Sequence, residues 1–132
     1  MFDATDNLLL TLHMLPPVLD TLKVNAERCH EAALGDGTIL ATELADYLVG
    51  KGVAFRDAHE VAGRAVRASL ESRTRLHEMP LAALRALDAR IGDDVYAALT
   101  LKAALAKRDV LGGTAPGRVR AEIERWQARL KA

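Results

Sequence analysis

The chain has 132 residues, and its 18 basic residues balance its 18 acidic ones. A chain of this size forms a single domain and can bury about two thirds of its unfolded surface in a core of its own. The balanced charge gives no basic excess for binding nucleic acid or an anionic membrane. The single cysteine, Cys29, excludes an intrachain disulfide and a cysteine-rich metal site, and it fits a reducing compartment.

Half of the residues are apolar but only 4% are aromatic, so the core is expected to consist mainly of leucine, alanine and valine. Richness in alanine and leucine favours helices. The sequence shows no strand-like alternation and no internal repeat. We therefore predict an all-α fold: a small domain of about five to six helices, preceded by an apolar helical segment.

The first segment, residues 2–15, is predicted to be a helix that is apolar on nearly every side. Its large apolar residues are Leu8, Leu9, Leu10, Leu12, Met14 and Leu15. A helix of this kind is usually buried on several sides. The segment lacks the basic start of a signal peptide and is too short to span a bilayer. Pro16 and Pro17 are expected to break or kink it, and a second helix is expected over residues 18–34, up to the turn Gly35-Asp36-Gly37.

Two further helices, joined by a tight stop, are predicted over residues 41–71. Thr42 is expected to cap the first, and Glu43 supplies negative charge to its first turn. The apolar stripe of this helix is Leu44, Tyr47 and Leu48. Gly52 is expected to end it in the left-handed conformation.

The second of these helices is predicted to begin near Phe55. Its expected inner face is Phe55, Ala58, Ala62, Ala65, Val66 and Ser69. Gly63 lies in its interior, where glycine costs ~1 kcal/mol relative to alanine, so we expect a close helix crossing there.

The rest of the chain is predicted to form a loop over residues 72–78 and three more helices. One starts at Pro80 and stops at Gly92, with its apolar face spaced by Leu81, Leu84, Leu87 and Ile91. Another spans residues 94–107, capped by Asp93, with a bend expected near Thr100. The last is capped by Thr114, has Pro116 in its first turn, and carries the stripe Val119, Ile123, Trp126 and Leu130.

The predicted core belongs to a compact domain over residues 42–132. Its members are Leu44, Leu48, Phe55, Val66, Leu84, Leu87, Val95, Leu99, Ile123 and Trp126. Because truncating a buried tryptophan typically costs ~3–5 kcal/mol, Trp126→Ala is expected to destabilise the domain by that amount.

The residues that carry chemistry are few. The four histidines, His13, His30, His59 and His77, show no metal-ligand spacing. His59 is interpreted as a structural histidine rather than an acid or base. Cys29 is interpreted as a small buried or interface residue, because no base lies near it in the sequence.

Three other groups have simpler explanations than catalysis. The carboxylate pair Asp93-Asp94 is attributed to helix capping. Capping also explains Gly112-Gly113-Thr114 better than phosphate binding does, because the P-loop lysine and a preceding strand are missing. The arginines of residues 64–75 are interpreted as a solvated face, with anion binding as a lesser alternative.

Several segments together resemble the C-terminal domain of argininosuccinate lyase. Residues 46–59 look like the family's ADYLVxKGxPFRxAH signature, and residues 22–28 look like its LxVNxER. Residues 94–96 match DVY, and residues 107–116 match R…GGTxP. These segments occur in the family's order and span most of the chain.

The resemblance implies membership of the fumarase and aspartase superfamily, whose members eliminate fumarate with a serine in a loop of signature GSSxMPxKxN. Neither Ser69 nor Ser72 lies in such a context. No residue therefore carries over as catalytic, and no cofactor or metal site is expected. Residues 1–25 resemble the end of the family's central domain, and residues 26–132 its C-terminal helical domain. Ala54 and Gly117 depart from the usual proline and the common acidic residue, at helix starts only.

Two functions remain open. The first is the C-terminal part of a cytoplasmic argininosuccinate lyase, which makes arginine and fumarate in arginine biosynthesis; this part would be structural. The second is a free-standing interaction or regulatory module derived from a lyase and without its activity. An autonomous enzyme is disfavoured because no nucleophile–base pair is visible. The expected partner is the remainder of the lyase or another copy, bound through the apolar N-terminal segment; no nucleic acid or membrane partner is expected.

Overall fold

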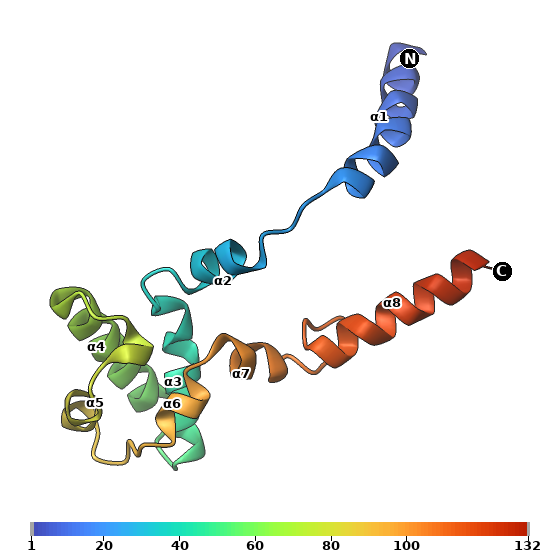
Figure 1. Cartoon of the computed structure of the whole chain (residues 1–132). Helices are drawn as coiled ribbons and strands as arrows, with labels where there is room; N and C mark the ends of the chain where they lie inside the picture. The colour runs from blue at the N-terminus through green and yellow to red at the C-terminus, as the bar shows by residue number, and fades with distance from the viewer. Residues whose placement is uncertain (1, 132) are drawn as a thin grey trace. The chain divides into compact units, whose positions relative to one another are not determined.

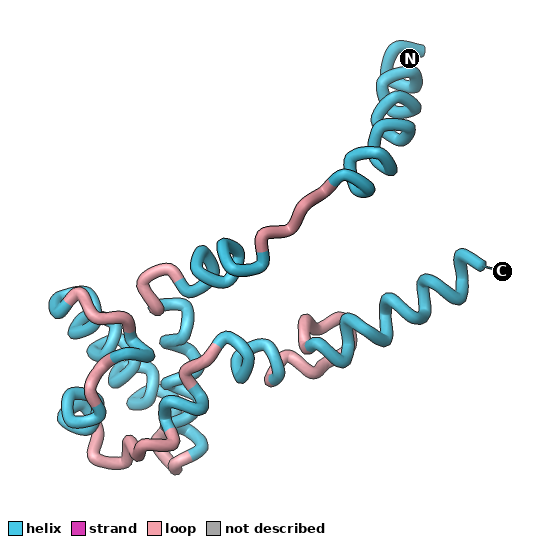
Figure 2. Tube along the Cα trace, viewed as in Figure 1, coloured by secondary structure: helices cyan, strands magenta, loops and turns pink. Residues whose placement is uncertain are grey.

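The computed structural model describes residues 2–131, and every regular element in that range is helical (Figures 1 and 2). This confirms the all-α prediction. The elements, two of them short 3-10 helices labelled η, are α1 (Phe2–Thr21), α2 (Ala26–Leu34), η1 (Thr38–Leu40), α3 (Ala41–Gly50), α4 (Phe55–Ser72), η2 (Leu76–Glu78), α5 (Leu81–Leu87), α6 (Val95–Ala98), α7 (Leu101–Ala106) and α8 (Pro116–Lys131). They form two compact units, Met1–Ala32 and Ala33–Ala132. None of the helices within residues 2–131 is long and apolar enough to cross a membrane.

The first unit contains α1 and most of α2. α1 continues through Pro16 and Pro17 as far as Thr21, so the expected break at the prolines is wrong, and the kink given as its alternative stays a prediction. Proline fixes φ near its helical value, so its backbone angle is compatible with the helix, although each ring removes a backbone donor and crowds the preceding turn. The break falls at residues 22–25 instead, because Asn25 starts α2: its side chain accepts a hydrogen bond from the Arg28 amide at 2.9 Å.

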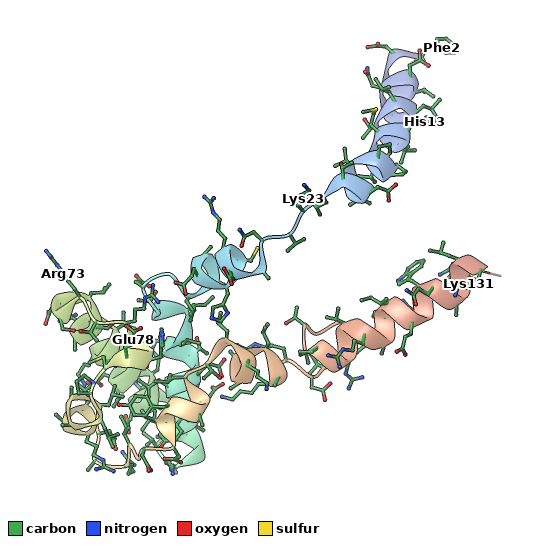
Figure 3. The ribbon with its side chains drawn as sticks, in the orientation of Figure 1. Phe2, His13, Lys23, Arg73, Glu78 and Lys131 are labelled. Atoms are coloured by element: carbon green, nitrogen blue, oxygen red, sulfur yellow. The ribbon has the colours of Figure 1, made fainter. Side chains whose placement is uncertain are left out.

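The side chains of α1 are exposed on every side. They project outward around the whole helix (Figure 3), and none of them is buried. Leu8 and Leu10, for example, are 59% and 62% exposed.

The core of the second unit is built around α3, which packs along α4 and against α6. Its fully buried large apolar residues are Leu40, Leu44, Leu48, Leu76, Leu84, Ile91, Val95 and Leu99. Burial was predicted for five of these, the leucines at 44, 48, 84 and 99 and the valine at 95, and is confirmed. Leu40 and Leu76 lie in short 3-10 helices, where helical periodicity gives no signal, and Ile91, expected on the apolar face of the helix after Pro80, is buried from the turn that follows α5.

The prediction of burial is wrong for three residues of the expected core. Phe55 is 67% exposed at the start of α4, and Ile123 and Trp126 are 51% and 47% exposed in α8. Val66 and Leu87 are half-buried. The stripe on α8 is as regular as predicted, but no other described part of the second unit covers it.

The ends of α3 and α4 are partly as predicted. Gly52 adopts φ +87°, and the Val53 amide donates to the Leu48 carbonyl at 3.0 Å, which confirms the left-handed stop. Thr42 is not a cap: α3 begins one residue earlier, and Leu40 in the capping position contributes no side-chain hydrogen bond. In α4, Val61 is buried in addition to the predicted small residues. The expected close crossing at Gly63 is absent from residues 2–131, since a Cβ there would meet open space.

The segment between α4 and α6 is more ordered than the predicted loop. α4 ends at Arg73, in the left-handed region with φ 52°, and η2 then buries Leu76 completely. α5 ends at Leu87 rather than continuing to Gly92. Ile91 is nevertheless buried, because the turn that follows α5 directs it into the core, where its carbonyl accepts a hydrogen bond from Arg85 Nε at 2.9 Å.

The helix predicted over residues 94–107 is two helices, α6 and α7. The division falls at the expected bend, where the Thr100 hydroxyl caps α7 by accepting from the Ala103 amide at 3.1 Å. In α8, the first helical bond runs from the Val119 amide to the Ala115 carbonyl. Ala115 therefore occupies the position expected for Thr114, with Pro116 in the first turn as predicted.

Two substitutions that shorten a side chain to alanine distinguish the observed core from the predicted one. Leu76→Ala should lower the free energy of unfolding by about 2–5 kcal/mol, because it leaves a cavity at a completely buried position. Trp126→Ala should change it by less than about 0.5 kcal/mol, as for other surface substitutions. Urea denaturation followed by far-ultraviolet circular dichroism measures both; a larger loss for the tryptophan variant would contradict the fold described.

Candidate functional site

The residues that could carry chemistry lie apart from one another. His13 is in α1, His30 in α2, His59 in α4 and His77 in η2. Within residues 2–131, no three His, Cys, Asp or Glu side chains are placed to hold a metal ion. Cys29, expected to be buried or at an interface, is exposed in α2. His59 lines a groove between α3 and α4 together with Phe55 and Gly63.

The arginines of residues 64–75 form no single cluster around an anion. Arg64 donates to the Leu87 carbonyl at 3.2 Å, so it joins α4 to the end of α5. Arg67 and Arg73 are exposed. This arrangement agrees with the interpretation of the run as a solvated face.

The carboxylate pair Asp93-Asp94 does not cap α6, because Asp94 in the capping position makes no side-chain cap bond. Its carboxylate instead binds two residues of the α3 end: it accepts from the Tyr47 hydroxyl at 2.6 Å and pairs with Lys51 Nζ at 2.7 Å. Tyr47 Oη also accepts from the Gly92 amide at 3.0 Å. Hydrogen bonds from Lys51 and Tyr47 hold the pKa of Asp94 below its ordinary value.

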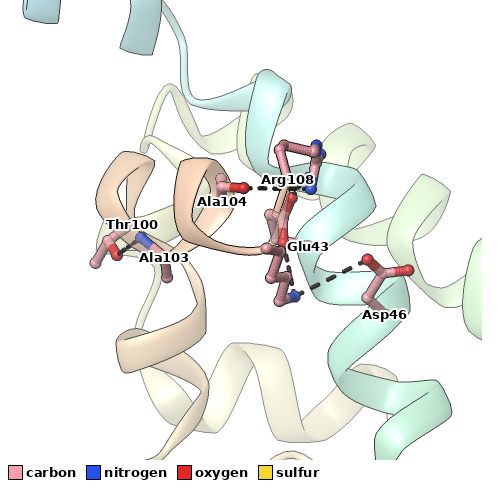
Figure 4. A network of polar contacts seen from close by, with 7 residues as sticks. Glu43, Asp46, Thr100, Ala103, Ala104 and Arg108 are labelled. Carbon is pink, nitrogen blue, oxygen red and sulfur yellow. Dashed lines mark hydrogen bonds and ion pairs between the residues drawn. The ribbon is translucent and has the colours of Figure 1, made fainter. Parts of the chain in front are cut away.

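A second and more buried carboxylate, Glu43, was interpreted as favourable negative charge in the first turn of a helix. Glu43 is only 1% exposed, and its two oxygens bind two neighbouring cations: Lys107 at 2.6 Å and Arg108 at 2.9 Å (Figure 4). Arg108 also donates to the Ala104 carbonyl at 3.3 Å, and Lys107 lies 3.9 Å from Asp46. This Glu43 cluster joins the first turn of α3 to the end of α7.

The protonation of Glu43 follows from two opposing effects. Burial by itself raises the pKa of a carboxyl group, because it disfavours the charged form. Hydrogen bonds from Lys107 and Arg108 outweigh burial here and hold the pKa of Glu43 below its ordinary value. Glu43 is therefore ionised in the folded chain at neutral pH, and its charge is matched by two cations that also reach solvent.

The loop after α7 fits tightly around the Glu43 cluster. Gly112 has φ +77°, and a Cβ added to Gly113 would overlap the carbonyl oxygen of Arg108. The Ala115 amide returns to that same carbonyl at 3.4 Å. The two glycines thus let the chain turn closely around Arg108, so their role is steric.

Both carboxylates have the geometry of structural ties. Both oxygens of each carboxylate are engaged by cations or a hydroxyl of this chain, which stabilises the charged form. Glu43 could have been found in the sequence, because it lies three residues after Leu40 and four before Tyr47, on the buried stripe of α3. A charge on such a stripe requires partners of opposite charge.

Glu43→Gln should lower the free energy of unfolding at pH 7 by about 1.5–3 kcal/mol, the usual range for hydrogen bonds to a charged group. Because the folded pKa of Glu43 is lowered, its contribution is complete above the ordinary carboxyl pKa and is lost as the pH falls through the folded value. The difference between the parent chain and the variant should therefore shrink in acid.

Asp46→Asn is the matched control, since Asp46 is exposed and 3.9 Å from the same lysine. It should change stability by less than about 1 kcal/mol, as exposed ion pairs do. Denaturant titrations from pH 7 down to pH 3 measure both variants. Equal effects of the two substitutions would contradict a special role for the buried carboxylate.

Comparison with known proteins agrees with this architecture. Residues 38–106 match the family model described as argininosuccinate lyase C-terminal. Over 130 residues, the chain is 49% identical to the argininosuccinate lyase of Thiobacillus denitrificans and 48% identical to those of Methylibium petroleiphilum and Halorhodospira halophila. Each match covers 98% of this chain but 28% of the relative. The matched family segment contains Asp94 with its partners Tyr47 and Lys51, and it contains Glu43, whereas the partners of Glu43, Lys107 and Arg108, directly follow its last residue. The chain belongs to the argininosuccinate lyase C-terminal family.

Proposed function

We propose that this chain serves as the C-terminal part of an argininosuccinate lyase, and that the activity belongs to the assembly of this part with the rest of the enzyme. The supporting observation is the uneven coverage: nearly all of this chain matches, but it spans little more than a quarter of the relatives. The reaction proposed is the cleavage of argininosuccinate to arginine and fumarate, in arginine biosynthesis in the cytoplasm.

Within that enzyme the role of this chain is structural. Its most buried carboxylate, Glu43, is neutralised by Lys107 and Arg108, and Asp94 is engaged by Tyr47 and Lys51. These groups hold helices together and leave no free nucleophile–base pair among them. No catalytic, cofactor-binding or metal-binding residue is assigned to the chain.

The two parts of the chain have different roles in this proposal. Residues 1–25 continue the preceding domain of the lyase, and residues 26–132 form the C-terminal helical domain. The exposed leucines of α1 support this division, since a helix with apolar side chains on every side needs neighbours on several sides. Those neighbours are the remainder of the lyase or another copy of the chain.

A chimeric enzyme tests the proposal. In the chimera, this chain replaces the matching segment of the Thiobacillus denitrificans argininosuccinate lyase. The chimera should release fumarate from argininosuccinate, measured by its ultraviolet absorbance, whereas the isolated chain should release none. His59→Gln in the chimera should keep the activity, because the histidine is assigned a structural role.

The control for the chimera is the Thiobacillus denitrificans lyase truncated just before the segment that matches this chain. This truncated enzyme should be inactive. A folded chimera without activity would contradict the proposal and favour a free-standing module. Turnover by the isolated chain, lost on substitution of one of its residues, would contradict the assignment of a purely structural role.

The isolated chain should self-associate through α1, because a continuous apolar surface larger than a few hundred Å² is rare on soluble monomers. Light scattering should give a mass above that of one chain for the full sequence. A chain beginning at Leu22, just after α1, should be monomeric with the helical signal of the second unit intact. A monomeric full chain with an ordered α1 would contradict this expectation.

A further inference from the structure

The last helix, α8, carries an apolar stripe that no other described part of the second unit covers. Its members are Val119, Ile123, Trp126 and Leu130, between 44% and 81% exposed, and Leu111 in the preceding loop is 94% exposed. These residues line a shallow depression along one side of the helix. A helix of 16 residues without packing is marginal in water, so α8 needs a partner surface to be stable.

The borders of this stripe are strongly basic. α8 contains five basic residues and two acidic ones. With about 3.6 residues per turn, Arg118 and Arg129 lie along one edge of the stripe, and Arg120 and Lys131 along the other. The acidic residue beside the stripe, Glu122, pairs with Arg125 at 2.8 Å.

The centre of the stripe has the same character. The guanidinium groups of Arg129 and Arg125 lie 5.1 Å and 5.5 Å from the centroid of the Trp126 ring. Tryptophan and arginine are the residues most enriched among those that dominate binding energies. A large aromatic side chain framed by cations suits a surface that is apolar in the middle and acidic around it.

A second copy of α8 is a poor occupant of the stripe. An antiparallel pair with matched stripes would bring each edge of the stripe against the same edge of the other copy. Arg118 would then face Arg129, and Arg120 would face Lys131, so that like charges meet. A parallel pair would have about two heptads of apolar contact, and coiled coils normally need at least three to four. Charge complementarity therefore points to a different, acidic partner.

We infer that α8 docks through the stripe Val119, Ile123, Trp126 and Leu130 onto an amphipathic helix whose own stripe is bordered by aspartate and glutamate. That helix lies in the part of the lyase subunit that this chain lacks. The inference rests on the proposed function, because that function supplies the missing part. It adds a second contact between the two parts, independent of α1.

Hydrogen exchange of α8, measured by mass spectrometry on the isolated chain and on the folded Thiobacillus chimera, tests the inference. In the isolated chain the amides of α8 should exchange almost as fast as in an unfolded peptide. In the chimera they should slow by more than about tenfold, because docking adds to the marginal stability of the helix.

Two sets of variants in the chimera identify the surface. Arg120→Glu with Arg129→Glu should return α8 to fast exchange, because both borders of the stripe would repel an acidic partner. Ile123→Ser with Trp126→Ser should do the same by removing the apolar contact. Arg67→Glu with Lys102→Glu, an equal change of charge on exposed residues of α4 and α7, should leave the protection of α8 unchanged.

Three results would overturn the inference. The first is an α8 that exchanges as fast in the chimera as in the isolated chain. The second is protection that survives the reversal of Arg120 and Arg129. The third is protection of α8 in the isolated chain that rises with concentration, since this would make a second copy the partner. Fumarate release is measured on the same samples: an active chimera with an unprotected α8 would remove the inference and leave the proposed function standing.

Discussion

A buried carboxylate at a core position of α3 governs the arrangement of the second unit. Taking the charge of Glu43 out of water is costly unless ionic partners with good geometry replace the lost solvation. Those partners, Lys107 and Arg108, are 64 and 65 residues away in the sequence. The end of α7 must therefore stay against the first turn of α3. Asp94 ties the start of α6 to the other end of α3 in the same way, so both ends of one helix are fixed by charge.

The fold could be predicted from the sequence where local chemistry and periodicity agree. The stop at Gly52, the start of α4 and the buried leucines of α3 followed from a left-handed glycine and a period of 3.6 residues. Leu76 escaped prediction because it is buried from a 3-10 segment, where no repeating pattern marks the inner face, whereas Ile91 was expected on an apolar face but in a helix that ends at Leu87. The α8 stripe shows the converse: a regular apolar face predicts that a helix packs, but not that its partner lies in the same chain.

The contacts that Glu43 and Asp94 make with their partners were less predictable than the fold. Each of its residues was noticed, but one at a time: Glu43 as a favourable charge near a helix start, Asp94 as a cap, and Lys107-Arg108 as part of a motif. Single positions gave no information about pairing, because the partners are distant in the sequence. The position of Glu43 on the apolar stripe of α3 was the one local signal that this carboxylate is not at the surface. The long-range pairing itself depends on the tertiary fold.

The absence of a side chain at Gly113 ties its evolution to that of Glu43. A Cβ at this position would displace the Arg108 carbonyl and the backbone that carries its guanidinium toward the carboxylate. A substitution at Gly113 would thus weaken the same interaction that a substitution at Glu43 removes. In genetic terms the two positions are epistatic: once either is lost, the second loss adds little. A variant that has already lost one of the two residues can therefore lose the other at little further cost in stability.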